Sequence, residues 1–200
     1  MLRWSKRADD EGMSRKPETL RRWETLGASS VYDCRVFSVT EHRRRSPRTG
    51  ELHDFYVLES SDWVNIVPLT AEQHVVMIHQ YRHGIGEFTL EIPGGMVDAD
   101  DPSPLAAARR EMREETGYDS DDVVALGVIH PNPAIQANRC HTFLARGAEL
   151  RSAVSFDSTE ETEVVLVPLD EIPRLIREGA ISHALVVVAF HHLLLMPSAR

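Results

Sequence analysis

The sequence predicts an α+β fold, an α/β/α sandwich with a mixed β-sheet that follows a β-rich N-terminal extension. Short β-prone runs outnumber helical segments, one strong helical segment lies between strand runs, and two more close the chain. The 200 residues match the length of one domain with a small appendage. We therefore expect a flexible tail over residues 1–20, a β-rich extension over 21–62 and the main domain over 63–200.

The first half of the chain holds most of the expected strands. The β-prone runs follow a charged, aperiodic start and occur around Val36 and Val39 and at 55–58, 64–69, 75–80 and 89–92. Between the first two runs, RRRSPRTGEL contains Pro47 and Gly50, which are turn residues and predict a hairpin loop. Pro93-Gly94-Gly95 predicts the end of the 89–92 strand.

The clearest helix is expected between Ser103 and Gly117. Ser103 is a suitable N-cap, Pro104 suits the first helical position, and LAAARREMREET contains strong helix formers throughout. Gly117 fits the position after the last turn, where the backbone often takes a positive φ. After this helix the pattern predicts strands at 123–129, 141–145 and 164–167 and helices at 171–178 and 182–195.

Composition excludes several classes of partner. A net charge of −9 is unsuited to nucleic acid, so any phosphate-bearing substrate must be met locally by cations or by metal. The longest apolar stretch, 184–196, is too short to span a bilayer, and the N-terminus lacks the apolar core of a secretory signal. With only two cysteines, we expect a cytoplasmic protein without a membrane partner.

Three carboxylates gather on the predicted helix. Glu111 and Glu115 are four residues apart and share a face, and Glu114 borders it. Their repulsion would be relieved by a hard divalent cation, Mg²⁺ or Mn²⁺, which prefers oxygen ligands and leaves room for a substrate phosphate. Arg110 could orient a carboxylate or contact phosphate. The alternative interpretation of this run is a solvated helix face.

The segment 91–118 resembles the Nudix box, G-x5-E-x7-R-E-U-x-E-E-x-G-U, where U is a bulky apolar residue. The second half is matched without a gap by Arg110, Glu111, Met112, Glu114, Glu115, Gly117 and Tyr118. The first half departs from it. Counted from Gly95, Asp101 falls where the first Glu belongs, and eight residues instead of seven separate it from Arg110. We interpret this as a one-residue insertion with an Asp in place of the Glu.

This resemblance implies a Nudix-type fold and a metal-dependent pyrophosphohydrolase. Glu111, Glu114 and Glu115, with the carbonyl of Gly94, are then the metal ligands. Glu111 and Arg110 are the catalytic residues of the box. The alternatives are hydrolysis of nucleoside triphosphates or dinucleoside polyphosphates, or a non-catalytic nucleotide-sugar sensor.

Residues outside the box resemble the ADP-ribose and nucleotide-sugar branch of the family. The resemblance lies in VVMIHQYRHG, in TLEIPGG and in the N-terminal pattern that begins at Trp23. It implies a nucleoside diphosphate sugar of the ADP-ribose or GDP-mannose type as substrate. Arg82 matches the arginine that contacts phosphate, and Met96 the residue just beyond the glycine, so the resemblance implies that both bind substrate. The extra N-terminal strands imply a swapped homodimer whose partner chain helps to form the nucleoside pocket.

Two assignments stay open at this point. Trp23 could stack on the nucleobase, but a core or interface role is equally compatible with the sequence. The catalytic base in this branch often lies in a late loop, and SFDSTEETEVV offers Glu160, Glu161 and Glu163, of which we favour Glu161 or Glu163. A solvated loop is the alternative for that run.

Overall fold

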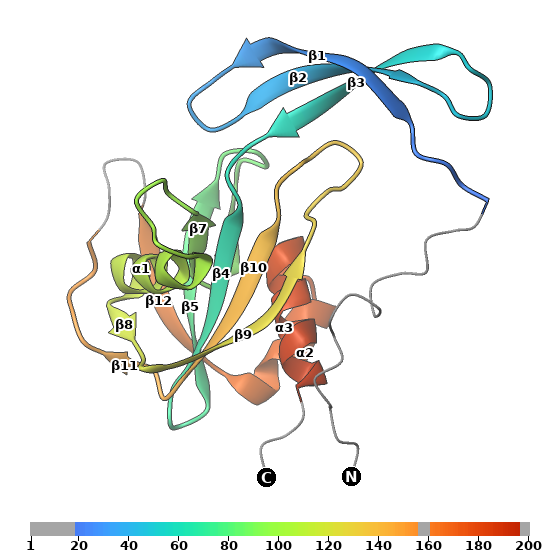
Figure 1. Cartoon of the computed structure of the whole chain (residues 1–200). Helices are drawn as coiled ribbons and strands as arrows, with labels where there is room; N and C mark the ends of the chain where they lie inside the picture. Colours follow the sequence, from blue (N-terminus) through green and yellow to red (C-terminus); the bar gives the residue numbers. More distant parts are fainter. Residues whose placement is uncertain (1–18, 156–160, 197–200) are drawn as a thin grey trace.

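A mixed seven-stranded sheet carries one helix on one face and two on the other (Figure 1). The computed structural model describes residues 19–155 and 161–196, so most of the expected tail lies outside the described residues. Strand order is β12-β5-β4-β10-β9, with β6 added to β5 and β7 to β4. The strands are β4 (Trp63–Leu69), β5 (His74–Arg82), β6 (Glu87–Glu91), β7 (Gly94–Met96), β9 (Asp122–Ile129), β10 (Cys140–Arg146) and β12 (Thr162–Pro168).

The helices complete an α/β/α sandwich, which confirms the predicted fold class. They are α1 (Pro104–Thr116), α2 (Ile172–Arg177), preceded by a 3₁₀ turn over Leu169–Glu171, and α3 (Ala184–Leu195). The sheet is mixed because β10 runs parallel to β4 but antiparallel to β9. No helix among the described residues is long and apolar enough to cross a bilayer.

Side-chain alternation along the strands divides the core into two layers. Val64 and Ile66 of β4 pack with Met112 on the α1 face, whereas Val67 packs with Phe190 on the face of α2 and α3. Each face of the sheet is therefore covered, and α1 is held against the sheet by its apolar side. Its polar side is left for the site.

Local signals set the ends of α1 as predicted. The Ser103 hydroxyl accepts a hydrogen bond from the N–H of Ala106, and Pro104 occupies the first turn. Gly117 ends the helix at φ 74°, and a Cβ there would collide with the carbonyl oxygen of Ser152. Because α1 begins and ends at fixed residues, its carboxylates lie at fixed positions along the helix axis.

The sheet opens at one end, next to α1. Strands β4 and β5 pair only at Leu69 and Val75, near one end of each strand. Toward the other end β7 pairs with β4, and β6 pairs with β5. The residues between Glu91 and Gly94 form the corner that links β6 to β7 across this opening. The sequence predicts this corner as a simple strand end, whereas Gly94 and Gly95 themselves continue into β7.

The N-terminal strands form a sheet of their own, above the sandwich in Figure 1. It comprises β1 (Glu24–Asp33), β2 (Ser38–Arg45) and β3 (Leu52–Glu59), all antiparallel. The predicted hairpin loop is shorter than expected, because three of its arginines belong to β2. Two short strands, β8 (Tyr118–Asp119) and β11 (Glu149–Leu150), pair beside α1. The N-terminal sheet touches the sandwich through Leu58, whose N–H and C=O bond to Ile135 and Ala137.

Candidate active site

Helix α1 turns the carboxylates of Glu111 and Glu115 toward the corner between β6 and β7. Both residues are buried, with 8% and 2% of their surface exposed, whereas the side chain of Glu114 is 44% exposed. Burial of two carboxylates one helical turn apart costs free energy unless cations or donors compensate it. The sequence spacing that predicts a shared face therefore corresponds to a charged, partly buried site.

The two glycines of β7 contact these carboxylates in different ways. The N–H of Gly94 donates to Oε2 of Glu115 at 2.9 Å. A Cβ on Gly95 would collide with the carboxylate of Glu111, lying 2.6 Å from its Cδ. A Cβ on Gly94 would instead meet the backbone of β4, 2.9 Å from Cα of Asn65. Gly95 thus allows Glu111 of α1 to approach β7 closely, whereas Gly94 allows β7 to pack against β4.

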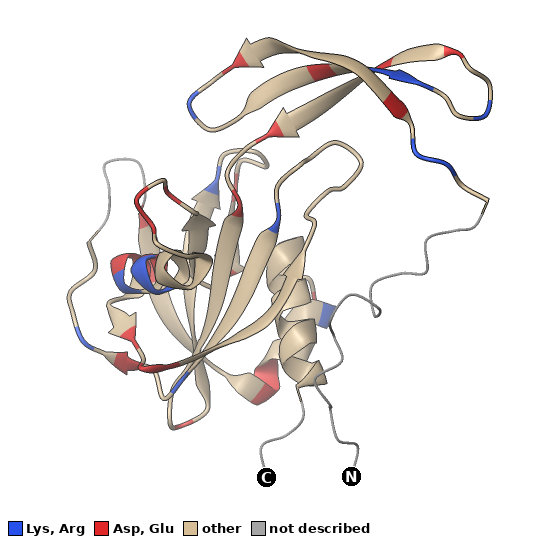
Figure 2. Ribbon diagram, viewed as in Figure 1, with Lys and Arg blue, Asp and Glu red and all other residues tan. Residues whose placement is uncertain are grey.

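Arg110 is the centre of an ion-pair cluster. Its guanidinium lies within 3.2 Å of a carboxylate oxygen of each of four acidic residues, namely Asp98, Asp101, Glu111 and Glu114. The hydrogen bond to Asp101, together with the nearby charges, raises the pKa of Arg110 well above its usual value. Figure 2 shows acidic and basic segments next to one another on α1.

Asp101, which stands where the first Glu of the box belongs, is part of this cluster. Asp101 bonds Arg110 through both carboxylate oxygens, at 3.3 Å to Nε and 2.9 Å to Nη2. The hydrogen bond from Arg110 lowers the pKa of Asp101. Met96 enters through its backbone, because its carbonyl oxygen accepts from Nη2 of Arg110 at 3.1 Å. The loop with the extra residue therefore still ends in a carboxylate that fixes Arg110.

The chemistry of these donors fits a hard divalent cation. Four carboxylates share one guanidinium, and oxygen donors of this kind are the ligands that Mg²⁺ and Mn²⁺ prefer. Within residues 19–155 and 161–196, no three His, Cys, Asp or Glu side chains converge as a metal cluster. The carboxylates of Glu111 and Glu114 each accept a hydrogen bond from Nη1 of Arg110, at 2.9 and 3.0 Å.

A second network lies at the same corner and contains Arg82, which the sequence analysis singles out; its partners Glu91 and His183 were missed by sequence reasoning. Glu91 is 2% exposed, and Arg82 binds it through two hydrogen bonds, 2.8 Å from Nε to Oε1 and 2.7 Å from Nη2 to Oε2. Thr89 donates to Oε1, and Nδ1 of His183 lies 2.7 Å from Oε2. Burial alone would raise the pKa of Glu91, but the bonds from Arg82 and His183 outweigh it and lower this pKa well below its usual range.

The two candidates for the catalytic base that the structure describes, Glu161 and Glu163, differ in where they lie relative to the box. Glu160 lies outside the described residues, and Glu161 is exposed just before β12. Thr162 turns toward α1, since its hydroxyl donates to the carbonyl oxygen of Glu115 at 3.0 Å. Because side chains alternate along a strand, Glu163 turns to the opposite face of the sheet. This geometry separates Glu163 from the box carboxylates.

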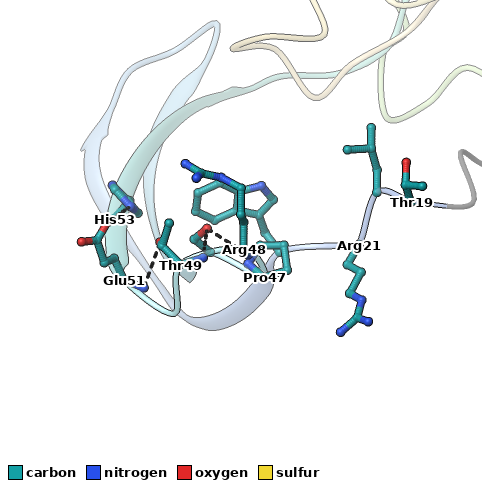
Figure 3. A pocket seen from close by; sticks show the side chains of 10 residues that line it. Thr19, Arg21, Pro47, Arg48, Thr49, Glu51 and His53 are labelled. Atoms are coloured by element: carbon teal, nitrogen blue, oxygen red, sulfur yellow. Dashed lines mark hydrogen bonds and ion pairs between the residues drawn. The ribbon is translucent and has the colours of Figure 1, made fainter.

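Trp23 directly precedes β1 of the N-terminal sheet, apart from α1. Its ring makes edge contacts with His53 and Phe55, at centroid distances of 5.5 and 5.2 Å. It lines a cavity of about 500 Å³ between the segment that carries Thr19 and Arg21 and the β2–β3 turn (Figure 3). Within one chain, Trp23 therefore lies beside the N-terminal sheet, whereas the box carboxylates lie on α1 of the sandwich.

The fold and site together define a class of protein, a hydrolase with an α/β/α sandwich and a carboxylate-rich helix beside a Gly-Gly strand. The NUDIX domain model matches residues 61–189, and the chain belongs to the Nudix family. It is a Nudix pyrophosphohydrolase, as its relatives indicate. Members of this family generally use divalent metal ions.

Several characterised proteins are similar over most of the chain. A CMP-5'-(N-acetyl-N-hydroxy-3-aminopropyl)phosphonate hydrolase of Streptomyces rubellomurinus is 32% identical over 79% of this chain and 75% of its own length. An ADP-ribose pyrophosphatase of Bacillus subtilis is 27% identical over 85% of this chain and 91% of its own length. The crystal structure of an ADP compounds hydrolase matches with a TM-score of 0.78 at 22% identity, covering 89% of this chain and 95% of that chain. The last of these shows the common fold.

Proposed function

We propose that this protein hydrolyses the pyrophosphate bond of a nucleoside diphosphate sugar, of the ADP-ribose or GDP-mannose type. The products are a nucleoside monophosphate and a sugar phosphate. The observation that carries the proposal is the buried pair Glu111 and Glu115 against the Gly94-Gly95 strand. The relatives that act on ADP-ribose, and the resemblance of the segments around Arg82 and Trp23, support this substrate class.

Each side chain of the site has a role in this reaction. Glu111, Glu114 and Glu115, with the carbonyl of Gly94, are the residues that would hold Mg²⁺ or Mn²⁺. When bound, the cation neutralises the diphosphate and activates a water molecule. Arg110 orients the carboxylates of Glu111 and Glu114 through its two hydrogen bonds.

The remaining roles lie outside the box. Arg82 contacts a phosphate of the substrate. Glu161 is the general base we favour, because β12 turns Glu163 to the far face of the sheet. Met96 lies at the entrance to the box loop and orders Arg110 through its carbonyl.

The nucleoside part of the substrate would bind at a site that two chains of a homodimer form together. Trp23 would stack on the base in a site completed by the partner chain. Its cavity contains Arg48 and His53, which suit an anionic, aromatic ligand.

We also propose a cytoplasmic location, since Cys34 and Cys140 are both free thiols. Burial raises the pKa of the Cys140 thiol to about 12, so this thiol is unreactive.

A product screen tests the proposed function. ADP-ribose, GDP-mannose, UDP-glucose, a CMP-phosphonate and a set of nucleoside triphosphates are each incubated with Mg²⁺ and with EDTA. We expect metal-dependent cleavage of a nucleotide sugar. Cleavage of triphosphates alone, with release of pyrophosphate, would contradict the proposal and favour a nucleoside triphosphate hydrolase. Binding of a nucleotide sugar without turnover would contradict it and favour the sensor alternative.

The matching variant is Glu115→Gln. Its amide oxygen can still accept from Gly94, so the fold is retained while a negative charge at the metal site is lost. We expect kcat to fall by about 10²-fold or more. Glu72→Gln, in the exposed β4–β5 turn, is the control and keeps full activity. Full activity in Glu115→Gln would remove the basis of the proposal.

A further inference from the structure

The carboxylate of Glu91 has donors on both of its oxygens. Oε1 accepts from Nε of Arg82 and from the Thr89 hydroxyl, and Oε2 accepts from Nη2 of Arg82. His183 completes the set, since Nδ1 lies 2.7 Å from Oε2 and an ionised carboxylate can only accept. Charge-assisted bonds of this kind, made in a buried setting, are short and strongly oriented.

His183 reaches this carboxylate from the other layer of the sandwich. It is 92 positions from Glu91 in the sequence and directly precedes helix α3. Its side chain makes no capping bond to that helix, so its polar contact is with Glu91. Nearby, the Asn65 side chain donates to the carbonyl oxygen of Leu185, which fixes the start of α3 against β4. The backbone of His183 is therefore held in place by the start of α3.

Arg82 is the outward end of the network. Its side chain is 41% exposed, whereas that of Glu91 is 2% exposed. Two parallel hydrogen bonds to one carboxylate fix the plane of the guanidinium as well as its position. An arginine already fixed in this way loses less conformational freedom when it binds an anion.

From this geometry we propose that His183 is a positioning residue, which holds Arg82 for the substrate diphosphate by fixing Glu91 from the α3 side. The inference rests on the proposed function for the role of Arg82, but not for the network itself. Without His183, Oε2 keeps the bond from Arg82 alone, and the carboxylate gains freedom to rotate. The Arg82 guanidinium would then lose its fixed plane.

The first test needs no substrate. Hydrogen exchange of the Arg82 Nε–H is measured by NMR in the wild-type chain and in His183→Ala. We expect exchange to accelerate by about fivefold or more in His183→Ala, and to return close to the wild-type rate in His183→Asn, whose amide nitrogen takes the place of Nδ1. The control is His191→Ala, an exposed histidine on the same helix. An unchanged rate in His183→Ala overturns the inference.

The second test separates positioning from stability. Steady-state kinetics on the nucleotide sugar that wild type cleaves should show KM raised about fivefold in His183→Ala, with kcat within about twofold. In an Arg82→Ala background, the same His183→Ala change should have no further effect on KM. An equal effect in both backgrounds would mean that His183 acts by another route. If wild type cleaves no substrate, the proposed function fails, and the NMR result alone decides the role of His183.

Discussion

Gly94 and Gly95 are adjacent, but an added methyl group would meet different neighbours at the two positions. At Gly95 it would meet the carboxylate of Glu111, which is the end of a flexible side chain. At Gly94 it would meet the backbone of β4, at Asn65 and Val64, which cannot move without breaking the strand pair. One substitution therefore displaces a site residue, and the other disturbs the fold.

We expect Gly95→Ala to lower kcat/KM by about tenfold or more and to change the free energy of unfolding by less than about 1 kcal/mol. Gly94→Ala should instead cost about 2–4 kcal/mol of stability, because overpacking against backbone cannot relax. Urea unfolding and kinetics on the same samples measure both. If Gly95→Ala kept full activity, the position of Glu111 would not matter for the reaction.

Glu91 links the site to acid stability. Its pKa is lowered in the folded state, so it contributes stability above its unfolded pKa, about 4.5, and this contribution is lost as pH falls below that value. We expect the free energy of unfolding to decrease below about pH 4.5. Glu91→Gln should lose about 1–3 kcal/mol at pH 7 and show a shallower acid decrease. The control Glu72→Gln, measured by urea unfolding from pH 7 to pH 3, should keep the wild-type slope.

At the scale of the element, helix α1 carries most of the site, and its two ends contribute differently. Ser103→Ala removes one capping bond and should cost about 1 kcal/mol. Gly117→Ala should cost more, because φ is 74° and the methyl group would collide with the backbone of Ser152. Urea midpoints with constant m-values test this order. A smaller loss for Gly117→Ala would mean that the end of the helix rearranges.

The same helix shows what could be predicted from the sequence. Its N-cap, its proline, its final glycine and the spacing of Glu111 and Glu115 are all local signals, readable within a few residues. The contact of His183 with Glu91 joins positions 92 apart and depends on how the sheet opens, which no local pattern encodes. The direction of Glu163 depends on the register of β12 against β5, which the periodicity of a short run does not fix.

At the scale of the whole molecule, the N-terminal sheet lacks a core of its own. No described residue before Val64 belongs to either apolar cluster, and Val31 and Tyr32 are 56% and 60% exposed. A three-stranded sheet needs a packed apolar face to be stable. A second copy of the chain supplies such a surface in the proposed homodimer, and it would also bring a Trp23 to the partner's α1.

Mixing two impaired variants tests this shared site. In a swapped dimer, Trp23→Ala impairs the nucleoside pocket of the partner, whereas Glu115→Gln impairs its own box. A heterodimer of the two variants contains one site with both residues intact, because the Glu115→Gln chain supplies Trp23 to the other chain's box. Random exchange makes half of the dimers mixed, each with one active site of two, so activity should return to about a quarter of wild type. Light scattering should give twice the chain mass of 22.6 kDa before and after mixing. If Trp23 served only its own chain, the mixed dimer would have no intact site, and activity would stay at the average of the two variants.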